Sequence, residues 1–308
     1  MIIILETLLL ALGFVLLVKG ADWFVDGASG IATKLRIPQL VIGLTIVAMG
    51  TSAPEAAVSI SAALKGSAEI TIGNIVGSNI LNILIILGLA SVIVPIAVAK
   101  STIRIDIPFM LAITGVLLVL GWDGTIGFPD AVILLALFIG YLAYLFIGAK
   151  NNPEAALAKD LSLTKSLAFT VMGLGLIIWG ADMAVDAATS LARIFGMSER
   201  FIGLTIVALG TSLPELFTSV SAARKGNADI AIGNIVGSNI FNILFIVGLS
   251  GVIVPVPFAP AFRIDTVVAF FAGIILLICA FPRKKLVRWH GFLMLAIYGV
   301  YLGYLLMV

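Results

Sequence analysis

The second half of the sequence repeats the first half at an offset of 160 residues. Between 43–95 and 203–255, 38 of 53 positions are identical, and the tripeptide GAD recurs at 20–22 and 180–182. An internal duplication constrains the fold more than any single motif, because the two copies are expected to form the same substructure. Any residue assigned a role in one copy should therefore have a counterpart in the other.

The duplicated segments belong to a series of apolar stretches of about 20 residues, the length of helix that crosses the hydrocarbon core of a bilayer. Hydrophobic residues make up 61% of the chain and charged residues 11%, whereas a soluble domain has about 25% charged residues. No basic residue precedes the first stretch and no A-x-A site follows it, so we interpret it as a retained helix rather than a signal peptide. We predict an all-α membrane protein with ten transmembrane helices, at 2–24, 39–64, 70–95, 103–121, 129–148, 165–187, 199–223, 230–255, 263–281 and 287–307.

Each half contains five predicted spans, an odd number, so the second half should cross the membrane in the opposite direction to the first. We expect two inverted repeats, at 1–150 and 151–308, whose ion-binding segments are 43–64, 70–95, 203–223 and 230–255. If the N-terminus is outside, thirteen basic residues lie in cytoplasmic loops and only four on the other side, namely Lys65, Arg193, Arg200 and Arg263. Because basic loops stay in the cytoplasm, both termini are predicted to be extracytoplasmic, in a multi-pass protein of the cell membrane.

Each copy places a proline and a glutamate in the middle of an apolar span, in GTSAPE at 50–55 and GTSLPE at 210–215. A proline removes one backbone N–H and leaves the carbonyl four residues earlier without its partner. Such an opening is tolerated at membrane depth only where protein or a water-filled cavity satisfies it. Helical spacing places Thr51 and Glu55 on one face with Ser52 beside them. The second copy repeats this set with Thr211, Ser212 and Glu215.

The segments GNIVGSNILN and GNIVGSNIFN add further polar groups at intervals of four residues: Asn74, Ser78 and Asn82 in the first copy, and Asn234, Ser238 and Asn242 in the second. The donor set holds carboxylate, hydroxyl, amide and carbonyl oxygens, with neither sulfur nor imidazole. Oxygen ligands suit hard cations such as Ca²⁺, which takes about six to eight of them. A buried carboxylate is costly in a membrane unless a partner neutralises it. We therefore predict that Glu55 and Glu215 bind a transported cation, with no cofactor. A protonated glutamate that merely joins two helices is the alternative, and it fits a duplicated constellation less well.

These motifs resemble the two α-repeats of the cation/Ca²⁺ antiporter superfamily, and specifically its prokaryotic sodium/calcium exchanger branch. The resemblance covers the whole chain. It implies that the second, third, seventh and eighth spans form an ion-binding core. It also implies that the first and sixth spans are long and slide across this core to alternate access, with smooth faces at Gly13, Gly20, Gly173 and Gly180. The implied activity is exchange of Na⁺ for Ca²⁺, usually three for one and therefore electrogenic.

The resemblance also implies a role for each site residue. Glu55 and Glu215 would be the carboxylates shared by Ca²⁺ and Na⁺, and Thr51 and Thr211 would add oxygens for Ca²⁺. The flanking Na⁺ sites would be lined by Ser52, Ser78, Ser212 and Ser238 and by the carbonyls of Ala48 and Ala208. Asn82 and Asn242 would close the middle of the core. Potassium-dependent relatives have Asp at the position of Asn242, so asparagine here implies exchange without K⁺.

Other functions would require residues that this sequence lacks. An intramembrane protease would need an H-E-x-x-H motif, a Ser/His pair or two membrane aspartates, whereas the single histidine, His290, lies in a basic loop. A cation channel fits inverted repeats with kinked helices less well than a carrier. An H⁺/Ca²⁺ exchanger of the same superfamily is the nearest alternative, although such relatives tend to have an additional acid in the G-N segments. The net charge of +2 gives no indication of nucleic acid binding, and the expected partners are the ions and the lipid bilayer, without an obligate protein partner.

Four aspartates near the predicted ends of the first and sixth spans are not part of this constellation: Asp22, Asp26, Asp182 and Asp186. We interpret them as interfacial or helix-capping residues in preference to a role in ion access.

Overall fold

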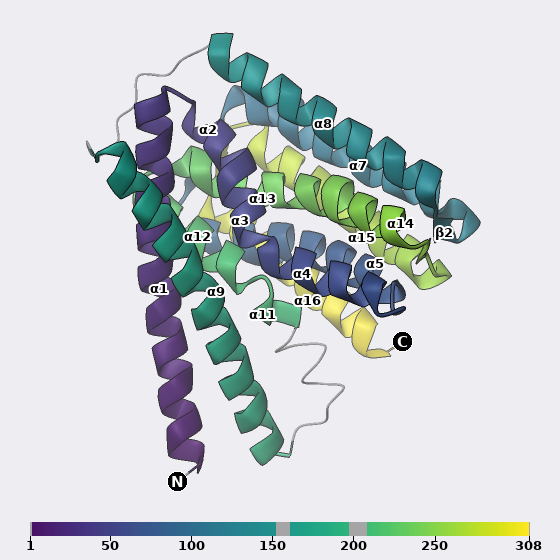
Figure 1. Ribbon diagram of the computed structural model, residues 1–308, viewed down its shortest axis with the longest axis horizontal. Helices are drawn as coiled ribbons and strands as arrows, with labels where there is room; N and C mark the ends of the chain where they lie inside the picture. Colours follow the sequence, from purple (N-terminus) through teal and green to yellow (C-terminus); the bar gives the residue numbers. More distant parts are fainter. Residues whose placement is uncertain (1, 152–160, 197–207, 308) are drawn as a thin grey trace.

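Two long helices, α1 (Ile2–Leu35) and α9 (Leu163–Ile194), lie side by side at one edge of the molecule (Figure 1). The computed structural model describes residues 2–151, 161–196 and 208–307. A Cβ atom added at Gly13 would lie 2.9 Å from the Gly180 carbonyl oxygen, and one added at Gly20 would lie 2.8 Å from the Gly173 carbonyl oxygen. The helices therefore touch backbone to backbone, and because residue numbers rise along α1 while they fall along α9, the pair is antiparallel.

Both long helices extend beyond their predicted ends at residues 24 and 187. In α1 the residues from Gly27 to Ala32 are buried, so contacts with the rest of the protein stabilise a stretch whose glycines and serine resemble a helix end. The expectation that Asp22 and Asp26 lie near a helix end was therefore wrong, since α1 continues to Leu35. Their counterparts Asp182 and Asp186 likewise lie inside α9.

The remainder of the first half is a series of helices, several of them interrupted. Its helices are α2 (Gln39–Ile42), η1 (Gly43–Val47), α3 (Ala48–Thr51), α4 (Ala53–Leu64), α5 (Glu69–Leu81), η2 (Asn82–Leu87), α6 (Gly88–Ile93), η3 (Thr102–Asp106), α7 (Ile107–Leu120), η4 (Gly121–Asp123) and α8 (Phe128–Asn151). Of these, η1, η2 and η3 are π-helical and η4 is a 3₁₀ turn. The π-helical turns were not predicted.

The second half follows the same order. Its described helices after α9 are α11 (Ala208–Gly210), α12 (Leu213–Arg224), α13 (Ala228–Phe241), the π-helical η6 (Asn242–Val247), α14 (Gly248–Ile253), α15 (Pro260–Ala280) and α16 (Arg288–Met307). The start of the predicted span 199–223 and the loop residue Arg200 lie outside the described residues.

Two short antiparallel pairings join the halves. Strand β1 (Ile96–Ala97) pairs with β4 (Lys285–Leu286), and β2 (Thr125–Ile126) pairs with β3 (Val256–Pro257). At the offset of 160 residues, β3 is the counterpart of β1 and β4 is the counterpart of β2. The two pairings are therefore equivalent contacts with the roles of the two halves exchanged. Reciprocal contacts of this kind are what two copies related by a twofold rotation produce.

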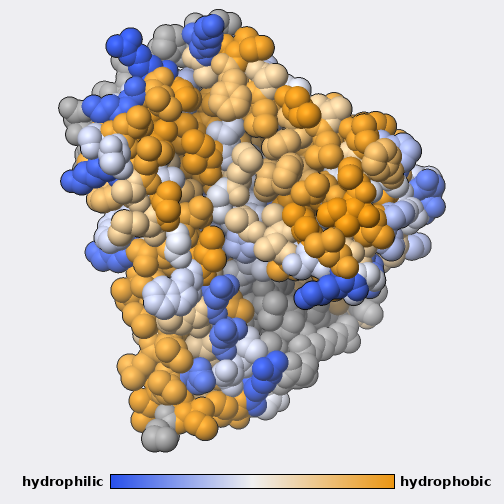
Figure 2. Space-filling view, in the orientation of Figure 1, coloured by the Kyte–Doolittle hydropathy of each residue, from blue (hydrophilic) through white to orange (hydrophobic). Residues whose placement is uncertain are grey.

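Within the described residues, seven helices are long and apolar enough to cross a membrane, and the bent pair 39–51 and 53–64 makes an eighth. The most apolar 18-residue stretch of each span shows where it lies in the bundle. In Ala228–Ile253, 94% of these residues are buried, and in Glu69–Ile93, 78% are buried. In α1 only 11% are buried. The segments that contain the G-N motifs thus form the centre of the bundle. Hydrophobic residues predominate on the face in view, over α1 and over α8 (Figure 2). Such an exterior fits a lipid environment, and the chain is an all-helical membrane protein.

Candidate ion-binding site

The proline of each GTS-x-PE motif lies in the first turn of a helix that follows a break in the span. In the first half, α3 ends at Thr51 and α4 begins at Ala53, with a bend of 50° between the two segments. In the second half, Ser212 separates α11 from α12. The break predicted from the prolines is confirmed. It places Glu55 and Glu215 in the first turn of α4 and of α12, where the helix dipole favours a negative charge.

The two glutamates are 1% exposed and are linked across the duplication by reciprocal hydrogen bonds. Ser52 Oγ donates to Glu215 Oε1 at 2.9 Å, and Ser212 Oγ donates to Glu55 Oε1 at 3.3 Å. The second oxygen of each carboxylate, Oε2, is buried and has no hydrogen-bond partner among the described residues. Two buried carboxylates that each leave one oxygen free make a site that a cation would stabilise.

Asparagines from α5 and α13 hold the broken helices in place. Asn234 Nδ2 donates to Ser219 Oγ at 2.9 Å and to the Glu215 carbonyl at 3.3 Å. In the other half, Asn74 Nδ2 makes the equivalent bonds to Ser59 Oγ and to the Glu55 carbonyl, at 3.0 and 3.3 Å. These bonds tie each glutamate-bearing turn to the G-N helix beside it.

Four amide side chains meet across the duplication in the middle of the core. Asn82 Nδ2 donates to Asn239 Oδ1 at 2.9 Å, and Asn242 Nδ2 donates to Asn79 Oδ1 at 3.0 Å. Asn79 and Asn239 in turn donate to each other's backbone carbonyls, at 3.2 and 3.1 Å. Each of the four amide groups thereby donates one hydrogen bond across the duplication. The buried Oδ1 atoms of Asn82 and Asn242 have no donor among the described residues.

The remaining predicted residues occupy different environments. Thr51 Oγ1 lies 2.9 Å from Asn234 Oδ1 and 3.3 Å from the Ala48 carbonyl oxygen, to which Ser238 Oγ also donates at 3.4 Å. Thr211 is only partly buried and lines a crevice beside Pro54. Ser78 is buried in α5, one helical turn from Asn82. Ala208 begins α11, directly after the undescribed stretch 197–207.

Sequence reasoning gave no role to Asn79 and Asn239. The duplicated GSN tripeptide was a signal that could have identified them, because it repeats an amide directly after each core serine. The structure adds that Asn82 and Asn242 each begin a π-helical segment, η2 and η6. Single π-helical turns are often found at functional sites.

Among the described residues of this core, the carboxylate and amide atoms without a partner are all oxygens: Glu55 Oε2, Glu215 Oε2, Asn82 Oδ1 and Asn242 Oδ1. Each of the four neighbouring amide groups donates to another protein oxygen. Hard cations that take carboxylate and carbonyl oxygens match this donor set, whereas soft metals prefer sulfur or imidazole.

The chain matches known proteins along its whole length. The sequence model of the family described as "Sodium/calcium exchanger protein" matches twice, at residues 5–147 and 165–307. The inner membrane protein YrbG of Escherichia coli K12 is 39% identical over 91% of this chain and 90% of its own. The sodium/calcium exchanger MaX1 of Methanosarcina acetivorans is 34% identical over 96% and 97%.

Solved structures agree with the sequence matches. The sodium-calcium exchanger NCX_Mj, in a crystal soaked with zero Na⁺ and Ca²⁺, superposes with a TM-score of 0.87 at 35% identity. The superposition covers 98% of this chain and 99% of that one. The chain is a member of the sodium/calcium exchanger family.

Proposed function

We propose that this protein is an antiporter that exchanges Na⁺ for Ca²⁺ at a site formed by Glu55 and Glu215. One observation carries the proposal: the two buried carboxylates meet across the duplication, each with one oxygen free of any partner in the described core. The family match supports the identity of the ions. Two carboxylates balance one Ca²⁺ or two Na⁺, so competition for the same pair couples the two transport directions.

The ligand roles proposed here are those that the family resemblance implies, and the free oxygens of Glu55 and Glu215 support the central part of the assignment. Ca²⁺ would be bound by the Oε2 atoms of Glu55 and Glu215, with Thr51 and Thr211 adding hydroxyl oxygens. Na⁺ would occupy flanking positions on the neutral oxygens of Ser52, Ser78, Ser212, Ser238, Ala48 and Ala208. A third Na⁺ would rest on these neutral oxygens alone, which would make the exchange electrogenic. The free Oδ1 atoms of Asn82 and Asn242 support their assignment to the middle of the site.

We infer that ten spans cross the membrane as two inverted repeats, with both termini extracytoplasmic. The antiparallel packing of α1 and α9 supports the inversion, because equivalent helices of the two copies run in opposite directions. The excess of basic residues in the loops assigned to the cytoplasm supports the orientation. In this arrangement the α12–α13 turn is cytoplasmic, and the α4–α5 turn faces outward.

Purified protein in lipid vesicles would test the assignment. We expect an outward Na⁺ gradient to drive uptake of ⁴⁵Ca²⁺, and an outward H⁺ gradient of equal size to drive little. Protein-free vesicles provide the leak control, and Glu215→Gln protein reconstituted at the same density provides the site control. Uptake that follows the H⁺ gradient and ignores Na⁺ would reassign the protein to proton/calcium exchange.

A further inference from the structure

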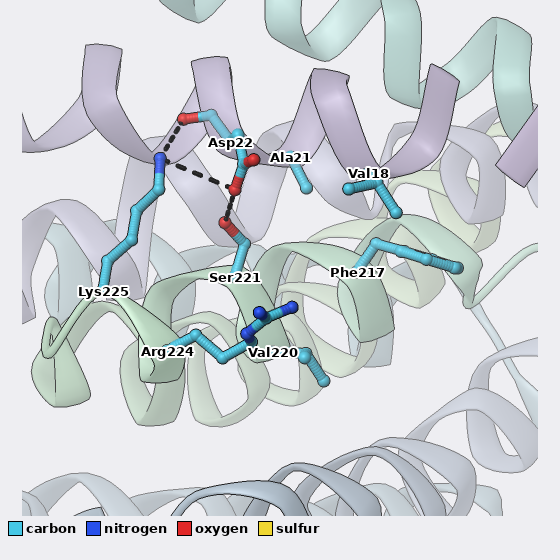
Figure 3. A pocket seen from close by; sticks show the side chains of 8 residues that line it. All are labelled: Val18, Ala21, Asp22, Phe217, Val220, Ser221, Arg224 and Lys225. Atoms are coloured by element: carbon cyan, nitrogen blue, oxygen red, sulfur yellow. Dashed lines mark hydrogen bonds and ion pairs between the residues drawn. The ribbon is translucent and has the colours of Figure 1, made fainter. Parts of the chain in front are cut away.

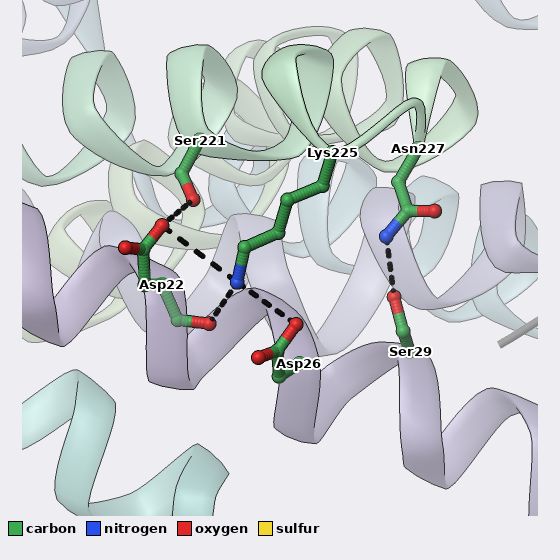
Figure 4. Close-up of polar contacts among 6 residues, drawn as sticks. All are labelled: Asp22, Asp26, Ser29, Ser221, Lys225 and Asn227. Carbon is green, nitrogen blue, oxygen red and sulfur yellow. Dashed lines mark hydrogen bonds and ion pairs between the residues drawn. The ribbon is translucent and has the colours of Figure 1, made fainter. Parts of the chain in front are cut away.

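Helix α1 is fastened to α12 by a cluster of ionic and hydrogen-bonding contacts around Lys225 (Figure 4). Lys225 Nζ lies 2.8 Å from Asp26 Oδ1, 3.7 Å from Asp22 Oδ1 and 2.6 Å from the Asp22 carbonyl oxygen. Ser221 Oγ donates to Asp22 Oδ1 at 2.7 Å. We call these four residues the α1 latch. They join one of the two long helices to a helix that carries a site glutamate.

Two further contacts close the same side of the molecule. Asn227 Nδ2 donates to Ser29 Oγ at 2.9 Å, beyond the last turn of α12. Nearer the site, Phe217 of α12 packs against Phe14 of α1 with ring centroids 5.9 Å apart. A hollow of about 350 Å³ remains between the helices, with Val18 and Phe217 at one end and Lys225 and Asp22 at the other (Figure 3). Pro214, which precedes the site residue Glu215, is buried and does not line this hollow.

The second copy has the same chemical groups but not the same contacts. The counterparts of the α1 latch are Asp182, Asp186, Ser61 and Lys65, which we call the α9 latch. In the described part of the chain, no hydrogen bond or ion pair connects Lys65 with either aspartate. Thr189, the counterpart of Ser29, has a buried Oγ1 without a partner among the described residues. The α9 latch is open.

A crevice of about 540 Å³ takes the place of these contacts between α9 and α4. Asp182 and Asp186 line it on one side, and Pro54, Ala57 and Thr211 line it on the other. Ala57 stands where the second copy has the bulkier Phe217, and the described residues that line this crevice include no aromatic side chain. Pro54 and Thr211 are sequence neighbours of Glu55 and Ser212, so the crevice extends to the edge of the site on this side only.

We propose that the two latches close alternately: the α1 latch holds the present state, and Lys65 joins Asp182 and Asp186 in the opposite state. Because α1 and α9 touch backbone to backbone, a displacement of one carries the other. Movement of this pair that closes the crevice at α4 pulls Asp22 and Asp26 away from Lys225. This inference rests on the proposed antiport and its topology, in which Lys225 is cytoplasmic and the crevice opens outward.

A latch of this kind acts on the equilibrium between states and not on ion binding itself. A cation between two partly exposed carboxylates contributes modestly to stability, so its loss is expected to shift a two-state equilibrium by about threefold to tenfold. Lys225→Met should therefore favour the state that is open between α1 and α12, and Lys65→Met should favour the present state. The opposite directions are the signature of alternate closing.

Thiol labelling of two reporter cysteines in detergent-solubilised protein tests this, in a Cys279→Ala background. Val58→Cys reports on the α9–α4 crevice and Val220→Cys on the α1–α12 hollow, whose linings contain these residues. We expect Lys225→Met to raise the labelling rate at position 220 and lower it at position 58, each by about threefold to tenfold. Arg224→Met is the matched control, since it removes a neighbouring positive charge that is not part of the latch.

Combination with Asp26→Asn distinguishes an ion pair from a general packing defect. If Lys225 acts through Asp26, the double variant should label like Lys225→Met alone, because the second change removes nothing further. Unchanged labelling in Lys225→Met, an equal shift in Arg224→Met, or fully additive effects would each overturn the proposal. The labelling ratio does not depend on which ion is carried. The latch and the Na⁺/Ca²⁺ assignment can therefore fail independently.

Discussion

At the centre of the molecule, Ser52 donates a hydrogen bond to Glu215 and Ser212 donates one to Glu55, so the contacts between the two copies are reciprocal. At the flanks, Lys225 binds Asp22 and Asp26, whereas Lys65 has no such bond in the described residues. The aspartates, the serine and the lysine of the latches are present in both copies. The flanks therefore differ in their contacts although their latch residues do not, and around the latches Phe217 is exchanged for Ala57 and Asn227 for Ser67. Reciprocal contacts at the glutamates, together with flanks that differ, are what the proposed alternating access through inverted repeats would require.

Replacing either glutamate should have the largest effect. Glu55→Gln and Glu215→Gln each remove one of two charges from a site that must balance a divalent cation, and we expect Ca²⁺ exchange to fall about a hundredfold or more, equivalent to about 2.8 kcal/mol. The measurement is Na⁺-driven ⁴⁵Ca²⁺ uptake, normalised to the amount of monodisperse protein. Equal losses in both variants would agree with the symmetric centre. Wild-type exchange in either one would contradict the site.

The amides of the core should come next. Asn79→Leu removes the acceptor for Asn242 Nδ2, so the amide of Asn242 is free to turn its N–H₂ group toward the cation. We expect the apparent affinity for Ca²⁺ to fall about tenfold, equivalent to about 1.4 kcal/mol, and Asn239→Leu to do the same through Asn82. Ser91→Ala is the control, because it removes a buried hydroxyl whose hydrogen bond in the described structure goes to the Gly88 carbonyl of its own helix. If the two variants lose Ca²⁺ affinity to different extents, the two halves of the centre contribute unequally to binding despite their reciprocal hydrogen bonds.

The centre could be predicted from the sequence because its chemistry is local. A proline and a glutamate inside an apolar span indicate a broken helix and a buried charge wherever they occur, and the duplication identified both partners. The pairing of Asn79 with Asn242 could not be predicted in this way. The orientation of an amide depends on which donor and acceptor face it, and here the partner lies 163 residues away.

The flanks could not be predicted for a different reason. Asp22 and Asp26 precede Gly27, Ser29 and Gly30, a composition typical of a helix end, yet burial against the rest of the protein continues α1 to Leu35. The proposed latches add a second reason. If each ion pair forms in only one of two conformational states, the sequence cannot indicate which of the two pairs is formed in a given structure. The sequence contains two identical sets of latch residues, and only the folded structure distinguishes the closed set from the open one.

Enlarging the contact between the two long helices should have a moderate effect. A Cβ atom at Gly20 would lie 2.8 Å from the Gly173 carbonyl oxygen, so Gly20→Ala forces α1 and α9 apart. We expect destabilisation by about 1–3 kcal/mol and slower exchange, with little change in Ca²⁺ affinity. Thermal unfolding and initial uptake rates would measure these effects. Gly140→Ala in α8, where nothing lies within 4 Å, is the matched control. A loss of Ca²⁺ affinity in Gly20→Ala would contradict the view that α1 and α9 affect the rate of exchange and not the binding of the ion.

Replacing K⁺ with choline should have the smallest effect, because the core has no carboxylate to spare for a co-transported monovalent ion. In the described parts of the duplicated segments 43–95 and 203–255, the buried polar side chains other than Glu55 and Glu215 are neutral amides and hydroxyls, and the buried Asp106 lies outside these segments, bonded to Tyr141. A K⁺ ion bound together with Ca²⁺ would find no counter-charge in a low-dielectric environment. We expect Na⁺-driven Ca²⁺ flux to stay within about twofold when K⁺ is removed. Asn242→Asp adds a third carboxylate to the centre and leaves the flanks unchanged. This carboxylate could bind a K⁺ ion or a proton, so the exchange should become sensitive to K⁺ or to pH. An absolute K⁺ requirement in the unmodified protein would contradict the two-carboxylate site.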